Sequence, residues 1–270
     1  MFYTDGILVK STLLEDADIC HAFSTRLGGV STHPDTASMN IAPGHGDSEE
    51  TVLQNTDILV RKMSDGAFTA EDAVVTSQIH SAKIRVLTAD NRGEGVIRAV
   101  GESCDGFVTD ASGVVPIVRT ADCVPILFVG KKSDGSPVVG AVHAGWRGTV
   151  SGIAAEAVKE MVSLGSELCT IKAAIGPHID KCCFEVQRDF YDSVAEVRGE
   201  DFAKRHITDE DGLHADLTSM NVEILLEVGV PRENIDVSGE CTCCLNKKYH
   251  SHRKTHGKRG AMGSLIGILK

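Results

Sequence analysis

The sequence predicts a single α/β (α+β) domain, residues 1–270, with a mixed, largely antiparallel β-sheet flanked by helices. Three observations predict this class: short apolar runs typical of buried strands, amphipathic stretches with helical spacing, and no strict alternation of strand and helix. Apolar residues make up 42% of the 270 residues. A chain of this length and composition can bury a core without disulfides or structural metals.

The strand signals lie mainly in the middle of the chain. Short apolar runs with Gly, Asp, Ser or Pro near their ends are typical of strands buried in a sheet. The expected strands are residues 114–118, 124–129, 138–142, 171–175 and 265–269.

Two stretches predict helices. Residues 150–164 carry apolar side chains three and four positions apart, and Gly165 ends the pattern. Residues 221–228 show a second helical pattern, which Gly229 ends. Residues 28–50 mix Gly, Ser, Thr, Pro and Asp with some apolar residues, which indicates an ordered loop region.

Charge and composition exclude several classes of protein. The net charge is −11 and no long basic block is present, so binding to nucleic acid is not expected. No segment reaches the roughly 18 apolar residues of a membrane span, and we expect no secretory signal at the N-terminus. We therefore expect a cytoplasmic protein without membrane partners, as a monomer or weak homo-oligomer. In the cytosol its nine Cys favour free thiols, metal ligands or catalysis over disulfides.

Residues 119–126 (RTADCVPI) place Asp122 and Cys123 in the connection between two apolar strands. A buried Cys often acts as a small hydrophobic residue. A carboxylate that enters a core needs a partner, however, so Asp122 makes a purely structural interpretation less satisfactory.

Residues 141–149 (AVHAGWRGT) place His143 at a strand end, before a Gly-rich turn and a helix. Backbone N–H groups and a positive helix end gather at such a turn, where Arg147 can grip phosphate or carboxylate with two hydrogen bonds. The alternative is a tight turn that requires Gly, with Trp146 filling the core.

His80, within Gln78-Ile79-His80, supplies a second imidazole. Together with Cys123 and His143 it forms a set that suits zinc in a catalytic site, with one position left for water. The same set suits copper. Because the three residues are far apart in the sequence, residue chemistry alone gives only a weak metal hypothesis.

A second group of possible ligands contains Cys241, Cys243 and Cys244, followed by several histidines. So many thiols and imidazoles in one stretch suggest a structural zinc. We interpret the spacing as Cys-x-Cys-Cys, which is not the usual Cys-x₂-Cys pattern, and whether this group binds metal stays open.

Taken together, these stretches resemble the YfiH/YlmD-type family, whose members are described as laccase-domain polyphenol oxidase, purine nucleoside phosphorylase or peptidoglycan editing factor. The resemblance covers nearly the whole chain, with the motifs in the family's order. The motifs are residues 21–31 (HAFSTRLGGVS), 38–40 (SMN), 46–47 (GD), 78–80 (QIH), 120–125 (TADCVP), 143–149 (HAGWRGT), 174–179 (AIGPHI), 183–186 (CFEV), 216–217 (DL), 241–242 (CT) and 251–253 (SHR). The chain departs from the family at Arg259-Gly260, where many members have Gly-Arg, and in its extra Cys243-Cys244 pair.

The resemblance implies that His80, Cys123 and His143 bind zinc. It also implies a CNF/YfiH-like fold, distantly similar to Cys–His toxin deamidases. The implied activity is zinc-dependent phosphorolysis of adenosine, inosine and methylthioadenosine, with adenosine deamination as a companion activity. Purine nucleosides and phosphate are therefore the expected partners.

For deamination, a metal-activated water needs a general acid/base. Asp122, adjacent to Cys123, is the candidate; its alternative role is to orient a His ligand.

For phosphorolysis, Arg26 and Arg147 are the expected phosphate-binding residues. Asn40 and Gln78 are expected to hydrogen-bond the sugar or base, and His178 to line the site.

Three other functions stay open. A copper-dependent polyphenol oxidase would need many His ligands, and the only His-x-His pair is His250 and His252 in a basic tail. A hydrolase could use Cys123 as nucleophile and His143 as base; activity without metal would favour it. The third is a non-enzymatic, peptidoglycan-editing role in cell-wall synthesis.

Overall fold

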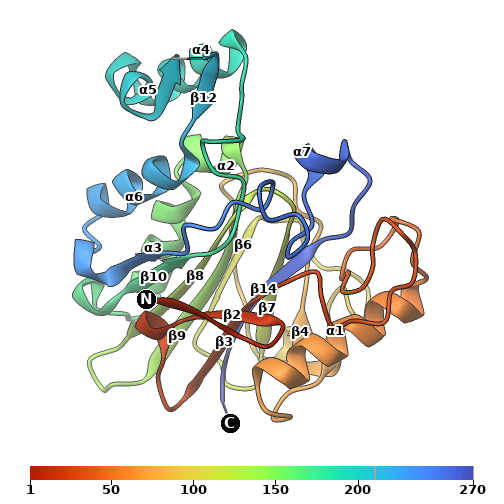
Figure 1. The fold of residues 1–270 in the computed structure, drawn as a ribbon. Helices are drawn as coiled ribbons and strands as arrows, with labels where there is room; N and C mark the ends of the chain where they lie inside the picture. The colour runs from red at the N-terminus through yellow and green to blue at the C-terminus, as the bar shows by residue number, and fades with distance from the viewer. Residues whose placement is uncertain (210, 270) are drawn as a thin grey trace.

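The computed structural model describes residues 1–209 and 211–269, and its described strands form two six-stranded sheets and one small hairpin (Figure 1). The first sheet has the strand order β1-β2-β3-β14-β7-β4. Its strands are β1 Phe2–Asp5, β2 Leu8–Ser11, β3 Ile19–Ser24, β14 Met262–Ile268, β7 Val115–Thr120 and β4 Ala73–Val74.

The second sheet has the strand order β13-β10-β8-β9-β6-β5. Its strands are β13 Ile235–Val237, β10 Lys172–Ile175, β8 Val124–Lys131, β9 Pro137–Ala144, β6 Gly106–Thr109 and β5 Ile84–Val86. The hairpin pairs β11 Ile207–Asp209 with β12 Leu213–Ala215. The α-helices are α1 Glu49–Met63, α2 Trp146–Val150, α3 Ile153–Ser163, α4 Arg188–Arg198, α5 Glu200–His206, α6 Leu217–Glu227 and α7 His252–Thr255.

Most neighbouring strands run antiparallel, while the pairs β4–β7, β5–β6 and β10–β13 are parallel. The predicted α/β class with a mixed, largely antiparallel arrangement is confirmed. The strands divide into two sheets where the sequence suggested one, because β8 has apolar side chains on both of its faces. Val124, Ile126 and Phe128 face the helices, whereas Leu127 and Val129 pack against the first sheet.

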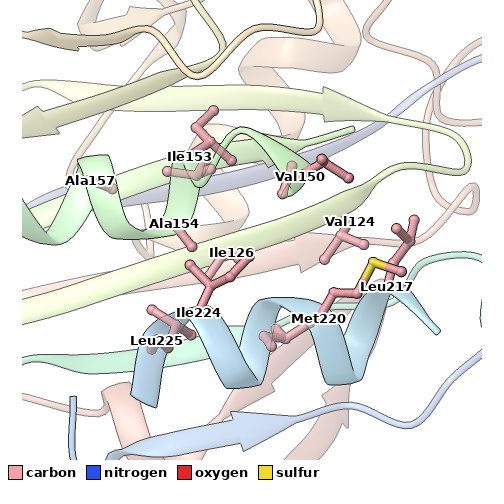
Figure 2. Close-up of a cluster of buried hydrophobic side chains, with 14 of the residues drawn as sticks. Val124, Ile126, Val150, Ile153, Ala154, Ala157, Leu217, Met220, Ile224 and Leu225 are labelled. Atoms are coloured by element: carbon pink, nitrogen blue, oxygen red, sulfur yellow. The ribbon is translucent and has the colours of Figure 1, made fainter. Parts of the chain in front are cut away.

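Helices cover the outer face of each sheet. On the second sheet, α3 and α6 lie side by side, and Ala154 and Ile224 meet Ile126 of β8 (Figure 2). On the first sheet, Leu59 of α1 packs with Leu265 of β14. None of the described helices is long and apolar enough to cross a lipid bilayer.

All five predicted strands are present as β7, β8, β9, β10 and β14. The helix expected over residues 150–164 divides at Gly152, whose φ of +82° interrupts it between α2 and α3. The other expected helix, α6, begins earlier, at Leu217, since the Asp216 side chain accepts a hydrogen bond from Ser219 N at 2.8 Å and caps it.

Replacing Ile126 by Ala is expected to lower the free energy of unfolding by about 2–5 kcal/mol, because it leaves a cavity between α3, α6 and the second sheet. Val197→Ala, at an exposed position of α4, should change it by less than about 0.5 kcal/mol. Urea unfolding of both variants at one fixed zinc concentration measures this, because a bound metal adds to apparent stability. Equal midpoints for the two variants would contradict the described packing.

Candidate metal centre

Two of the predicted ligands are brought together by the pairing of β8 with β9. Cys123 lies in the turn between β7 and β8, and His143 is near the end of β9. The register places Pro125 opposite His143 and Val124 opposite Ala144. The residue before β8 and the end of β9 therefore meet at the same edge of the second sheet.

His80 reaches the same edge from the loop between β4 and β5. Its backbone has a φ of +59°, a left-handed conformation that is uncommon for a residue with a side chain. The Cys123 Sγ lies 4.0 Å from His80 Nε2. The ligand atoms of His80, Cys123 and His143 all lie within 4.8 Å of one another.

Asp105, just before β6, holds this arrangement. Its Oδ1 is 2.9 Å from His143 Nδ1 and accepts a hydrogen bond of 2.9 Å from His80 N. Its Oδ2 accepts hydrogen bonds from Ile79 N at 3.3 Å and from Ser81 N at 2.7 Å. One buried carboxylate thus fixes both the His143 ring and the unusual backbone at His80.

The three groups shift one another's pKa. Burial alone would raise the pKa of Asp105, but hydrogen bonds from His143 and Ser81 lower it to about 2. Burial would also raise the pKa of Cys123, yet His143 and His80 lower it to about 6. Burial opposes charge on His143, but Asp105 and Cys123 raise its pKa to about 9. Cys123 is therefore readily available as a thiolate.

The donor set fits a single metal ion. His143 Nδ1 faces Asp105, which leaves Nε2 on the side of Cys123 as the atom to bind a metal, and a carboxylate behind a histidine is the usual support of a metal-bound imidazole. The ligand atoms of a tetrahedral zinc ion lie roughly 3.5 Å apart, close to the separation of Cys123 Sγ and His80 Nε2. A Cβ at Gly145 would lie 2.8 Å from His80 Cδ2, so the ligands pack directly on this glycine.

The ligands open into a cavity of about 640 Å³. Its wall contains aromatic, cationic and small side chains from both sheets and from the C-terminal segment. The lining residues are Ala42, Pro43, His45, Ser77, Gln78, His80, Arg119, Thr120, Ala121, Asp122, Cys123, His143, Trp146, Ile179, Phe184, Leu217, His252, Arg253, Arg259 and Ala261.

Asp122 and Gln78, two of the predicted site residues, both line this cavity. Asp122 Oδ1 accepts a hydrogen bond of 2.6 Å from Thr242 Oγ1, and Oδ2 accepts one of 2.8 Å from Arg253 N. Gln78 is held by the backbone of Arg119, with Nε2 donating to its carbonyl at 2.8 Å and Oε1 accepting from its N–H at 2.7 Å.

Arg26, Asn40 and His178 do not line the cavity, and their polar atoms are engaged inside the protein. The Arg26 guanidinium donates to the carbonyls of Ala37 and Asn246. The Asn40 amide bonds two backbone segments and the Asp47 carboxylate. His178 Nδ1 lies 2.8 Å from Gly176 O, and Nε2 lies 2.8 Å from Thr218 Oγ1. The geometry therefore favours structural roles for the three side chains.

Arg147 is exposed, and its guanidinium carbon lies 4.2 Å from the centroid of the Trp146 ring. Only Trp146 of the pair lines the cavity. The expected turn and helix follow His143, but α2 has only five residues before Gly152 interrupts it, so its end offers little of the dipole of a long helix.

Four residues to which the sequence interpretation assigned no functional role lie at the centre or line its cavity: Asp105, His45, Arg119 and Arg259. A signal existed for Asp105, because an acid directly before the apolar strand β6 needs a partner, as reasoned for Asp122. No local pattern marked the other three, which come together only through the fold.

Several known proteins are similar to this chain in sequence, in fold or in both. A purine nucleoside phosphorylase named YlmD, from Geobacillus stearothermophilus, is 35% identical over 252 residues, covering 90% of this chain and 88% of that protein. A protein named adenosine deaminase RL5, from an unknown prokaryotic organism, is 33% identical over 258 residues, covering 92% and 93%. The crystal structure of the Bacillus licheniformis hypothetical protein YfiH superposes with a TM-score of 0.87 at 31% identity, covering 99% of this chain and 98% of that one.

A family model described as multi-copper polyphenol oxidoreductase laccase matches residues 20–269. With these relatives and the shared fold, the chain belongs to the YfiH/YlmD-type family.

Proposed function

We propose that this protein is a zinc-dependent purine nucleoside phosphorylase acting on adenosine, inosine and methylthioadenosine, with adenosine deaminase activity in the same cavity. One observation carries the proposal: the His80–Cys123–His143 set and a group of cationic side chains line one cavity. The names of the relatives support both activities. We also propose that residues 1–270 act as one catalytic domain, because β14, near the C-terminus, pairs with β3 and β7.

The cavity suits a nucleoside with an anion. Its volume of about 640 Å³ is within the range of roughly 300–1,000 Å³ that is usual for small-molecule sites. Trp146 and Phe184 present aromatic surface, to which a purine ring can bind through its face or edge. The Arg119 backbone holds the Gln78 side chain in place. The second amide hydrogen and the second lone pair of Gln78 would form hydrogen bonds with the sugar or base.

Arg119 and Arg259 are the best candidates to hold phosphate. Arg119 Nη2 donates to Thr76 O and Arg259 Nη1 to Gly260 O, while Arg259 Nε has no partner among the described residues. Burial lowers the pKa of both guanidinium groups. An anion between them would relieve the cost of burying positive charge, which is the usual basis of a phosphate site.

His45 lines the same cavity, close enough to Arg119 and Arg259 for their charges to affect its pKa. Burial lowers its pKa, and Arg259, Arg119 and His252 lower it further. Positive charge is therefore concentrated around His45, and an anion bound at this place would be stabilised by it.

Bound zinc would act as a Lewis acid on the purine or on the water that attacks it. The protein's own groups would position the reactants and move the proton. Arg119 and Arg259 would hold phosphate for attack on C1′ of the ribose. Asp122, held in orientation by Thr242 and the N–H of Arg253, would accept and return the proton during deamination.

A Cys hydrolase is the second candidate, because His143 and His80 lower the Cys123 pKa to about 6 despite burial. A thiolate beside an imidazole is the arrangement that nucleophilic catalysis uses. Multi-copper chemistry has less support. His250, in the one His-x-His pair, has Nε2 2.9 Å from Met39 O and Nδ1 accepting from Gly260 N, which leaves no ring nitrogen free for copper.

We expect the purified protein to release hypoxanthine from inosine only when phosphate is present, and to lose this activity when a chelator removes its metal. Product analysis by liquid chromatography, with zinc or copper added back separately, measures both requirements. Restoration by zinc supports the proposal. Release of hypoxanthine by the metal-free protein without phosphate would favour the Cys hydrolase, and phenol oxidation restored only by copper would favour the oxidase.

Asp105→Asn is expected to weaken zinc binding at the cavity about 10–100-fold, as loss of a carboxylate behind a metal ligand typically does. Asp110→Asn is the matched control, because Asp110 lies just beyond the other end of β6 and pairs with Lys132. Competition titration with a chromophoric chelator gives both affinities. If the two variants bind zinc equally well, Asp105 does not organise the centre.

Arg259→Ala is expected to raise the KM for phosphate roughly tenfold or more, the loss expected for a hydrogen bond to a charged group. Arg147→Ala provides the comparison, because the sequence favoured Arg147 and the geometry does not place it in the cavity. Steady-state phosphorolysis of inosine at varied phosphate distinguishes them. A larger KM for phosphate in Arg147→Ala than in Arg259→Ala would contradict the proposal and would indicate that phosphate binds at the turn after His143.

A further inference from the structure

A second group of metal-ligand side chains lies apart from His80, Cys123 and His143. The Sγ atoms of Cys182, Cys183, Cys241 and Cys244 all lie within 4.8 Å of one another. Cys183 Sγ is 3.4 Å from Cys244 Sγ, and Cys182 Sγ is 3.7 Å from Cys244 Sγ and 3.8 Å from Cys183 Sγ. The residues come from two segments of irregular structure, one after β10 and one after β13.

We propose that these four cysteines bind one structural zinc ion. Four thiolates at about 2.3 Å from a tetrahedral zinc ion lie roughly 3.8 Å apart. The three separations among Cys182, Cys183 and Cys244 are close to this value, and the Cys241 Sγ lies within 4.8 Å of each of the other three. A disulfide would bring two Sγ atoms to about 2.05 Å, closer than any pair here. The arrangement is that of a closed structural site, with every position taken by protein and none left for water.

The backbone around Cys241 is also built for a bound metal. Cys241 and Cys244 are separated by two residues, which is the Cys-x₂-Cys spacing of zinc-binding turns. Cys241 Sγ accepts a hydrogen bond of 3.5 Å from Asp180 N. Such a hydrogen bond stabilises a thiolate and orients it as a ligand.

This site differs from the group that the sequence suggested. Cys243 is left out, because its Sγ is not among those that lie within 4.8 Å of one another. Cys182 and Cys183 take part instead. The Cys-x-Cys-Cys interpretation overlooked that Cys241 and Cys244 have Cys-x₂-Cys spacing. The second pair, Cys182 and Cys183, is distant in the sequence and lies next to the first only in the folded protein.

The four cysteines lie next to residues that form one wall of the cavity. Arg253 Nη1 donates to Cys183 O at 2.9 Å, and Nη2 donates to Glu185 O at 3.0 Å. Phe184 and Arg253 both line the cavity. Zinc at the four cysteines would join two segments that no long strand pairing holds together, and so fix this wall of the cavity.

Elemental analysis of the full-length protein tests the proposal. We expect about two zinc ions per chain in the wild type, one for each ligand group. Cys244→Ser should lose one and Cys123→Ala the other, while Cys169→Ser, an exposed thiol outside both groups, keeps both. A zinc ion that Cys123→Ala retains and Cys244→Ser loses supports the proposal even if the cavity itself binds no metal.

Cobalt substitution gives a second readout that needs no cluster variant to fold. Cys123→Ala loaded with Co²⁺ should show the strong thiolate-to-cobalt absorption of a tetrathiolate site. Absence of this absorption, or wild-type protein with no zinc beyond that lost in Cys123→Ala, would overturn the proposal. So would intact mass spectrometry showing a disulfide among the four cysteines of freshly purified protein.

Discussion

The buried carboxylate of Asp105 is the constraint on which the candidate centre depends. Burying a charge is costly unless hydrogen bonds and opposite charge compensate it. Asp105 obtains both by binding three successive backbone N–H groups, from Ile79 to Ser81, and the ring of His143. The same contacts hold His80 in its left-handed conformation. The ligand geometry is thus set by the protein, and a metal ion would bind to groups already in position.

The two-sheet architecture explains why the site lies where it does. The register of β8 and β9 brings Cys123 and His143 to one edge of the second sheet. Arg119, from β7 of the first sheet, reaches the same cavity from the opposite layer. The packed helices and the interface between the sheets hold these strands in place. The distance between Arg119 and the candidate ligands Cys123 and His143 is therefore fixed by the fold.

The sequence predicted the central strands well because they are buried on both faces and form apolar runs that need no knowledge of their partners. It did not predict α1, although Ser48 before two glutamates is a helix-start signal. The candidate ligands His80, Cys123 and His143 could be named from the sequence because few residue types bind metals, and the fold brings their ligand atoms within 4.8 Å of one another. Residues whose roles depend on distant partners were harder to predict. The sequence left Arg26 and Asn40 available for substrate, yet their polar atoms form hydrogen bonds inside the protein. Arg259 Nε, by contrast, has no hydrogen-bond partner within residues 1–209 and 211–269.

The central claim is that His80, Cys123 and His143 hold one zinc ion at the cavity. Diffraction data collected at the zinc absorption edge, from crystals grown without chelator, test it most directly. We predict an anomalous peak about 2.0–2.3 Å from His80 Nε2, Cys123 Sγ and His143 Nε2, with Asp105 still bonded to His143 Nδ1. Absence of an anomalous peak at these three atoms, in zinc-supplemented crystals whose metal content is verified, would contradict it.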